Sequence, residues 1–269
     1  MSSEFKNKVI VVTGAASGIG AAVCDRFARA GACLMLLDRD EAGVNAAVDK
    51  LRARGIDALG FRCDVACEDE CTAAIERIIA HRGGIDVLVN NAGITQRSAF
   101  VDTDSSVYRR VLDVNFFGSL YCTKAAIGSL IERKGMIIVI ESLAGVAPLL
   151  GRTGYCASKH ALHGLFTTLR SEIGTTGVHV MIVCPGFVET NLQTRALGGD
   201  GQVTTHPQSV VGKPTSAARV AADIFAGALA RKPMLVLTPV GKLSYWINRL
   251  APGLYARIMT RQVREELIR

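Results

Sequence analysis

Long hydrophobic runs are absent from this chain of 269 residues. No window approaches 18 uninterrupted apolar residues, the length that a membrane-spanning helix needs, and the first residues, MSSEFKNK, carry no apolar signal region. Internal repeats and low-complexity tracts are missing as well. Hydrophobic residues nevertheless make up 49% of the chain, which is enough for a substantial core. We therefore expect one globular domain over residues 1–269, located in the cytoplasm and neither secreted nor membrane-spanning.

Cysteine is not used here as in a disulfide scaffold. The eight cysteines are scattered through apparent strands and helices of a chain without an export signal, which favours reduced thiols. Cys63, Cys67 and Cys71 are spaced four apart and suggest a metal site as the alternative. Asp64 follows Cys63 at a strand end and breaks any single helical face, and zinc sites usually have closer cysteine pairs. The sequence therefore predicts no metal site.

Acidic residues are scarce only near the C-terminal end. Residues 231–269 contain eight basic residues and two acidic ones, whereas the rest of the chain, within a net charge of +7, is nearly neutral. A nucleic-acid-binding domain would carry a basic stripe with interleaved aromatic residues over its body. We therefore expect no nucleic-acid partner.

Strand-like and helix-like segments alternate along the whole chain. Apolar runs of strand length lie at residues 9–13, 33–37, 58–63, 87–90, 136–140, 178–183 and 234–237. Segments of helical character lie at residues 21–30, 41–54, 68–81, 105–133, 155–173 and 216–231. Most of the apolar runs are continuous, which is typical of strands covered on both faces. The pattern predicts an α/β fold with a doubly wound parallel sheet.

The stretch TGAASGIG, Thr13 to Gly20, joins the first expected strand to a helix that begins near Gly20. Glycines let the backbone approach a phosphate closely, and a helix N-terminus offers unpaired N–H groups and the positive end of its dipole. Gly14, Gly18 and Gly20 therefore predict a cradle for the pyrophosphate of a dinucleotide. The alternative is a glycine-rich connection chosen for its turn geometry alone.

Asp38 ends the second expected strand, 24 residues after Gly14. A carboxylate there can accept the ribose hydroxyls of NAD and would repel the 2′-phosphate of NADP. Arg39 follows and could bind that phosphate if Asp38 turned aside, and an ordinary charged turn would explain both residues. The pair favours NAD over NADP.

These residues belong to a longer series that resembles the classical short-chain dehydrogenase/reductase family. The series is TGAASGIG, Asp64–Val65, NNAG at Asn90 to Gly93, Asn115, Ser142, YCASK at Tyr155 to Lys159, Pro185–Gly186 and Thr190. Each motif is weak alone, and eight in order are highly specific. The resemblance implies a single-domain, Rossmann-type fold with a seven-stranded parallel sheet and a nicotinamide cofactor.

The same resemblance assigns contacts to the cofactor. Asp64 and Val65 would frame the adenine, Asn90 and Gly93 would stabilise the turn beneath the cofactor, and Val188 and Thr190 would hold the nicotinamide carboxamide. Turn chemistry alone is the alternative for the asparagines and for Pro185–Gly186. The full expected set is Gly14, Ser17, Gly18, Ile19, Gly20, Asp38, Arg39, Asp64, Val65, Asn91, Ala92, Gly93, Tyr155, Lys159, Pro185, Gly186, Val188 and Thr190.

Tyr155 and Lys159 are four residues apart, so a helix places them on one face. A free tyrosine has a pKa of about 10, and moving it to about 7 requires roughly 4 kcal/mol of preferential stabilisation of the phenolate. A nearby ammonium and an oxidised nicotinamide supply the sign that is needed, so Tyr155 can act as general acid or base. Such a pair also occurs on many helices for packing and solvation alone.

Ser142, thirteen residues before Tyr155, would orient the reacting oxygen by a hydrogen bond. The resemblance adds that Lys159 holds the nicotinamide ribose and that Asn115 fixes a water in the proton path. Ser142 as a strand-end cap and Asn115 as a helix irregularity are the alternatives. Glu141 departs from the family, which commonly has a small residue there. We expect it to form a local salt bridge or hydrogen bond rather than to take part in catalysis.

Residues 187–215 form the longest stretch of weak pattern, which in a compact domain is usually a lid or a binding element. Its apolar residues are Phe187, Leu192, Leu197 and Val203, and its few charges are Glu189, Arg195 and Asp200. They favour an apolar secondary alcohol or ketone as substrate, steroid-like or lipid-like. The substrate itself is not identified by the sequence.

The C-terminal segment 241–269 is basic and amphipathic, and it breaks at Pro252–Gly253. Apolar residues recur at helical spacing on both sides of the break, at Leu243, Trp246, Ile247, Leu250, Leu254, Tyr255, Ile258, Met259, Val263 and Leu267. Arg257, Arg261 and Arg264 would occupy the other face. The segment can pack over the substrate mouth, against another subunit or on an anionic membrane, and these uses stay open.

The sequence thus predicts an NAD(P)(H)-dependent oxidoreductase that interconverts a secondary alcohol and a ketone and forms a homodimer or homotetramer. A cofactor-sensing or scaffold protein of the same fold, with its basic tail bound to a partner or membrane, is the alternative. Ser142, Tyr155 and Lys159 argue against it, because a binding protein need not keep them.

Overall fold

The computed structural model describes residues 4–206 and 208–264. Seven strands form one parallel sheet in the order β3-β2-β1-β4-β5-β6-β9. They are β1 (Val9–Thr13), β2 (Cys33–Asp38), β3 (Ala58–Arg62), β4 (Val87–Asn90), β5 (Met136–Ile140), β6 (His179–Cys184) and β9 (Met234–Val236). The seven-stranded parallel sheet is confirmed, and each expected strand lies within one residue of its observed ends.

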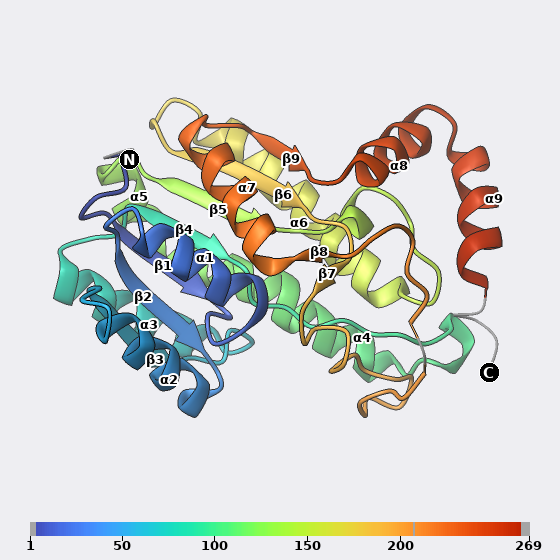
Figure 1. The fold of residues 1–269 in the computed structure, drawn as a ribbon, viewed down its shortest axis with the longest axis horizontal. Coiled ribbons are helices and arrows are strands. Elements are labelled where there is room, and N and C mark those ends of the chain that lie inside the picture. The colour runs from blue at the N-terminus through green and yellow to red at the C-terminus, as the bar shows by residue number, and fades with distance from the viewer. Residues whose placement is uncertain (1–3, 207, 265–269) are drawn as a thin grey trace.

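Helices cover both faces of the sheet (Figure 1). They are α1 (Gly18–Ala28), α2 (Glu41–Arg52), α3 (Glu68–Arg82), α4 (Ser105–Leu112), α5 (Gly118–Glu132), α6 (Thr153–Glu172), α7 (Ala217–Leu229), α8 (Pro239–Leu250) and α9 (Pro252–Val263). One apolar core unites the sheet with α1, α2 and α7, and a second unites the opposite face with α3, α5 and α6. Strands buried from both sides explain the continuous apolar runs of the sequence.

Helix α1 begins at Gly18 inside the glycine motif, slightly before the start near Gly20 that the sequence suggested. Ser17 precedes it with an extended backbone, and the helix ends before Gly31, whose φ of +79° suits glycine. The helix therefore starts directly at the carboxyl end of β1, where its N-terminus faces the crevice between β1 and β4. In an open α/β sheet, that change of strand order is where ligands bind.

The helical segment expected over residues 105–133 is not one helix. A π-helical turn, Asp113–Phe117, separates α4 from α5. Asn115 lies in this turn, and its buried side chain bonds the backbone of Ile94, so the turn is tied to the segment that follows β4. Hydrophobic periodicity does not reveal a single wide turn, because the apolar residues resume after it.

Two further segments lie over the carboxyl end of the sheet. The loop of residues 187–215 is closed at its base by two-residue strands, β7 (Val188–Glu189) and β8 (Thr215–Ser216), which pair in parallel. Helices α8 and α9 form a hairpin at the end of the molecule that lies away from the N-terminus (Figure 1). Within the described part of the chain, no helix has both the length and the apolar character needed to cross a membrane.

Candidate active site

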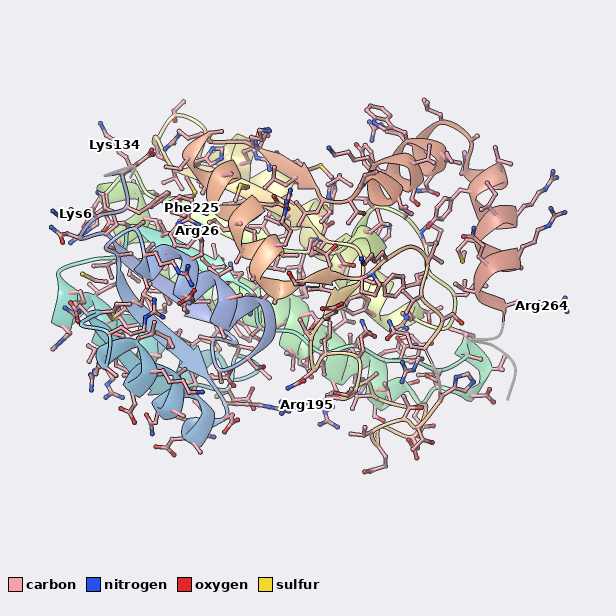
Figure 2. The ribbon with its side chains drawn as sticks, in the orientation of Figure 1. Lys6, Arg26, Lys134, Arg195, Phe225 and Arg264 are labelled. Carbon is pink, nitrogen blue, oxygen red and sulfur yellow. The ribbon has the colours of Figure 1, made fainter. Side chains whose placement is uncertain are left out.

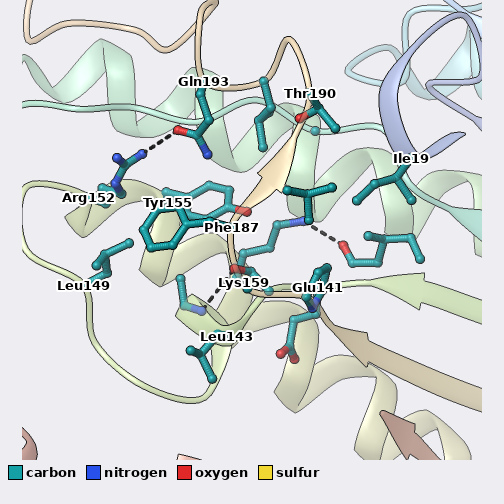
Figure 3. A pocket seen from close by; sticks show the side chains of 18 of the residues that line it. Ile19, Glu141, Leu143, Leu149, Arg152, Tyr155, Lys159, Phe187, Thr190 and Gln193 are labelled. Atoms are coloured by element: carbon teal, nitrogen blue, oxygen red, sulfur yellow. Dashed lines mark hydrogen bonds between the residues drawn. The ribbon is translucent and has the colours of Figure 1, made fainter. Parts of the chain in front are cut away.

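One cavity of about 1200 Å³ opens at the carboxyl ends of the central strands. Its walls come from the glycine motif, the segments that follow β2 to β6, the loop 187–215 and the α8–α9 hairpin. Its size suits a dinucleotide together with a substrate. Figure 3 shows part of this cavity with Tyr155 and Lys159 inside it.

The glycine motif has the geometry of a phosphate cradle. Gly14 and Gly18 have φ of +64° and +56°, which a residue with a side chain rarely adopts. A Cβ on Gly20 would lie 2.2 Å from the carbonyl oxygen of Gly14. The first turn of α1 contains no acidic residue, and Ser17 forms no side-chain capping bond. Gly18 and Ile19 of this turn line the cavity, and the helix N-terminus has no side-chain cap, which fits a pyrophosphate.

A hydrogen-bond network supports the glycine motif from β4. The Asn91 side-chain amide donates to the carbonyls of Thr13 and Gly14 at 2.9 and 3.1 Å. The Thr13 hydroxyl accepts from the backbone N–H groups of Asn91 and Ala92. Asn90, to which the resemblance gave this supporting part, instead donates from its buried amide to Thr123 of α5. Asn91 is therefore the residue that supports the turn.

Asp38 is held in place by the backbone on both sides of its carboxylate. One oxygen accepts from Ala16 N and the other from Asp40 N, each at 3.0 Å. The fixed carboxylate lines the cavity beside Arg39, whose side chain is exposed. A carboxylate at the end of β2 fits the ribose hydroxyls of an adenine dinucleotide.

Tyr155 and Lys159 lie on the cavity side of α6 and are both buried. Lys159 Nζ donates to the carbonyl of Ile140 at 2.9 Å and lies 5.7 Å from the centre of the Tyr155 ring. Ser142 follows β5, and its hydroxyl accepts from Ala144 N at 3.1 Å. Helix and strand thus bring together three side chains that are far apart in the sequence.

Burial dominates the titration of this cluster. It raises the pKa of Tyr155 to about 12, while the hydrogen bond with Ser142 and the charge of Arg152 oppose that shift. It lowers the pKa of Lys159 to about 8, and the negative charge of Glu141 opposes that shift. The sequence pointed to Lys159 as the cation that lowers the pKa of Tyr155. Among the protein's own cations, Arg152 has the largest such effect.

Asn115 does not line the cavity but lies behind it. Its side-chain oxygen accepts from Ile94 N at 2.8 Å, and its amide donates to the Ile94 carbonyl and to Ser158 Oγ. Ser158 is the residue before Lys159, and its hydroxyl donates to the Tyr155 carbonyl. Asn115 therefore connects the π-helical turn to the part of α6 that faces the cavity.

The Glu141 side chain, directly before Ser142 in the sequence, is completely buried and points away from the Tyr155 ring (Figure 3). One carboxylate oxygen is 2.9 Å from His163 Nδ1 of α6, and the other accepts from Cys184 Sγ of β6 at 3.0 Å. The expected local partner is therefore present, although it comes from a helix and a strand rather than from a neighbouring loop. The negative charge of this carboxylate raises the pKa of Lys159, against the lowering effect of burial.

Sequence reasoning missed Arg152. Its side chain is buried in the cavity wall, and Nη1 donates to Gln193 Oε1 of the loop 187–215 at 3.1 Å (Figure 3). It stands immediately before α6, so neither helical spacing nor a motif marked it. The only sequence feature that could have marked Arg152 as a site residue is its position three residues before Tyr155. The lid is apolar as expected at Phe187, Leu192 and Leu197, but the cavity wall also contains this cation.

Almost every predicted site residue lines the cavity. The lining residues include Gly14, Ser17, Gly18, Ile19, Asp38, Arg39, Asp64, Val65, Asn91, Ala92, Gly93, Ser142, Tyr155, Lys159, Pro185, Gly186, Val188 and Thr190. Gly20 and Asn115 lie behind it as described. Over the residues 4–206 and 208–264, no group of three or more His, Cys, Asp or Glu side chains could hold a metal ion.

Comparison with known proteins shows similarity over nearly the whole chain. A family model described as short chain dehydrogenase matches residues 8–198. "Dehydrogenase/reductase SDR family member 7B" from Bos taurus is 35% identical over 274 residues, covering 99% of this chain and 84% of that protein. The protein of the same name from Mus musculus is 36% identical, covering 97% of this chain and 83% of that protein.

Solved structures have the same architecture. A short-chain dehydrogenase/reductase from Burkholderia phymatum, in complex with NAD, superposes with a TM-score of 0.83 at 25% identity and covers 93% of this chain and 96% of that one. A short-chain dehydrogenase from Streptomyces avermitilis gives a TM-score of 0.82 at 28% identity, with 94% and 96% covered. The cavity of this chain thus belongs to a fold that holds NAD in one of these neighbours.

Proposed function

The chain is an oxidoreductase of the short-chain dehydrogenase/reductase family, and from that premise we propose that it interconverts a secondary alcohol and a ketone with a nicotinamide cofactor. One observation carries the proposal. Ser142, Tyr155 and Lys159 converge in a cavity that also contains a glycine turn able to hold a pyrophosphate. A cofactor site and an acid–base group thus share one cavity.

The residues around the glycine turn would hold the cofactor. The N–H groups at the start of α1 suit the phosphates, Asp38 suits the adenine ribose, and Thr190, whose side chain lies next to Gly18, closes over the turn. A fixed carboxylate at that position favours NAD over NADP. A nicotinamide dinucleotide bound here supplies or accepts the hydride.

Tyr155 handles the proton. In ketone reduction, its hydroxyl gives the proton to the carbonyl oxygen while the carbonyl carbon receives the hydride, and Ser142 donates a hydrogen bond to the same oxygen. With a pKa of about 12, Tyr155 keeps its proton at neutral pH, which suits reduction. In oxidation the phenolate must form, and the positive charges of Arg152 and Lys159 stabilise it.

The walls of the substrate half support an apolar substrate. Leu149, Phe187, Leu192 and Met259 line it. Polar side chains also line the cavity, among them Asn191, Gln193 and Arg152. Arg152 lies beside the reacting group, where it can bind an oxygen of the substrate. We therefore place the substrate among lipid-like or steroid-like alcohols and ketones.

The test is a panel of alcohols and ketones assayed by nicotinamide absorbance with NAD and with NADP. Tyr155→Phe should abolish turnover and leave NADH binding intact, whereas Tyr121→Phe, a change of the same kind on α5, should leave both unchanged. Normal turnover by Tyr155→Phe would disprove the assignment of the acid–base group.

A further inference from the structure

The α8–α9 hairpin exposes apolar side chains on the side that faces away from the protein. Leu250 is 77% exposed, Trp246 is 55% exposed and Leu254 is 52% exposed. Trp246 and Leu250 are one turn apart on α8, and Leu254 lies in the first turn of α9, directly after the break at Pro252. A cluster of large apolar side chains at a protein surface usually marks an interaction site.

The same surface is strongly basic. Lys242, Arg249, Arg257, Arg261 and Arg264 all have exposed side chains. No acidic residue occurs between Pro239 and Arg264, and none of these five cations forms an ion pair with another described residue. Glu265 and Glu266 lie outside the described residues, as does Leu267 of the expected apolar stripe. Figure 2 shows Arg264 at the end of the molecule opposite Lys6 and Lys134.

The opposite side of the hairpin faces the cavity and the segment after Ser142, so Trp246, Leu250 and Leu254 are not part of the core. Ile247, Tyr255 and Met259 line the cavity. The Tyr255 hydroxyl donates to the Pro148 carbonyl at 3.1 Å, and the Asn248 amide donates to the Val146 carbonyl at 3.0 Å. The apolar stripe of the C-terminal segment thus divides into an inner half over the cavity and an outer half that faces solvent.

We propose that this outer hairpin face, defined by Trp246, Leu250, Leu254, Arg257 and Arg261, binds the surface of an anionic phospholipid bilayer. Charge complementarity selects this occupant. Apolar side chains flanked by cations enter the boundary between headgroups and acyl chains, and each arginine near an anionic surface attracts it further. A second copy fits less well, because two-fold pairing would bring together two faces that both carry arginines, and residues 239–264 contain no acidic residue to pair with them.

Binding in this orientation would place the cavity next to the bilayer. The inner residues Ile247, Tyr255 and Met259 separate the outer hairpin face from the substrate half of the cavity. An apolar alcohol or ketone dissolved in the membrane could then enter without crossing water. This consequence rests on the proposed function, whereas the docking itself does not depend on turnover.

The test is flotation of the whole protein with vesicles of phosphatidylcholine and phosphatidylglycerol (7:3) and with vesicles of phosphatidylcholine alone. The protein should float with the anionic vesicles and lose this binding as the salt concentration rises. Arg257→Gln with Arg261→Gln should lower the partition coefficient about thirtyfold, at about 1 kcal/mol for each charge. Trp246→Ser with Leu250→Ser should lower it at least about tenfold. The control Lys50→Gln with Lys232→Gln removes two exposed charges elsewhere and should have no effect.

NADH binding and circular dichroism report whether each variant is folded, so a loss of vesicle binding can be assigned to the surface. Absence of binding to anionic vesicles, or equal losses in the arginine variant and its control, would overturn the proposal. The proposal would also be overturned if the parent protein did not bind vesicles and light scattering showed an oligomer that Trp246→Ser with Leu250→Ser converts to a monomer. Vesicle binding without turnover on any substrate would instead count against the proposed function.

Discussion

Gly20→Ala tests whether the close contacts beneath the glycine turn matter. The new methyl group would lie 2.2 Å from the carbonyl oxygen of Gly14 and 2.6 Å from Asn91 Nδ2. Carbon does not approach either atom more closely than about 3 Å, so the turn must open by roughly 1 Å. The two bonds from Asn91 to Thr13 and Gly14 would break at that displacement.

The expected size follows from these contacts. Overpacking of this kind costs about 2 kcal/mol, and each lost bond costs about 1 kcal/mol. The better helix propensity of alanine returns about 1 kcal/mol, so the free energy of unfolding should fall by about 3 kcal/mol. Displacement of the N–H groups that face the phosphates should remove at least one charge-assisted bond, which raises the Kd for NADH about thirtyfold.

Gly128→Ala is the matched control. Gly128 is an exposed residue within α5, and an added Cβ would meet nothing within 4 Å. The same substitution should there raise the free energy of unfolding by about 1 kcal/mol and leave NADH binding unchanged. Urea denaturation and NADH fluorescence titration measure both quantities. If Gly20→Ala matched the parent in stability and affinity, our account of the turn would be refuted.

Three other predictions concern the charges of the cavity. Asp38→Ala should weaken NADH binding and improve the relative affinity for NADPH, since it removes the carboxylate that repels the 2′-phosphate; an unchanged preference in paired titrations would contradict this. Lys159→Met should inactivate the enzyme and yet stabilise it by about 3 kcal/mol at pH 7. Burial lowers the pKa of Lys159 from 10.5 in the unfolded chain to about 8 in the folded chain, so the folded chain binds this proton less tightly. Below pH 8 Lys159 is charged in both states, and its burial then destabilises the folded state. The advantage should shrink as the pH rises from 8 towards 10.5, and urea denaturation at pH 7 and 9.5 would show whether it does. Glu141→Gln keeps the shape of the side chain but removes the charge that raises the pKa of Lys159, so that pKa should fall, and the pH–rate profile should shift to lower pH. If the pH–rate profile of Glu141→Gln superposed on that of the parent, Glu141 would have no long-range effect on Lys159. His163→Gln keeps the carboxylate of Glu141 and serves as the control.

The sheet was predictable because its signal is local. Strands buried on both faces must be apolar throughout, so each run of the sequence marks one strand within a residue of its ends. The residues of the candidate cavity were predictable for a related reason, since the carboxyl ends of parallel strands meet at one edge. Motifs that follow β1, β2, β4, β5 and β6 therefore meet in space, although they are far apart in the chain.

The remaining features depend on contacts between distant segments. Asn91 rather than Asn90 supports the glycine turn, and only the orientation of the residues after β4 decides between the two. Arg152 is buried and bonds Gln193 of the loop 187–215, and the path of that loop follows from no periodic pattern. The partners of Glu141 come from α6 and β6, so they could be found only once these elements were placed side by side.

The π-helical turn Asp113–Phe117 holds one residue more than an α-helical turn, because its hydrogen bonds run from residue i to residue i+5. Loss of that one residue would restore the α-helical ladder and keep α5 in phase with α4, so Cys122, Ala126 and Leu130 would stay on the buried side of α5. The extra residue is therefore not needed to bury α5. It serves to turn Asn115 towards Ile94 and Ser158, so a one-residue deletion here should leave the chain folded and break the connection between this turn and α6.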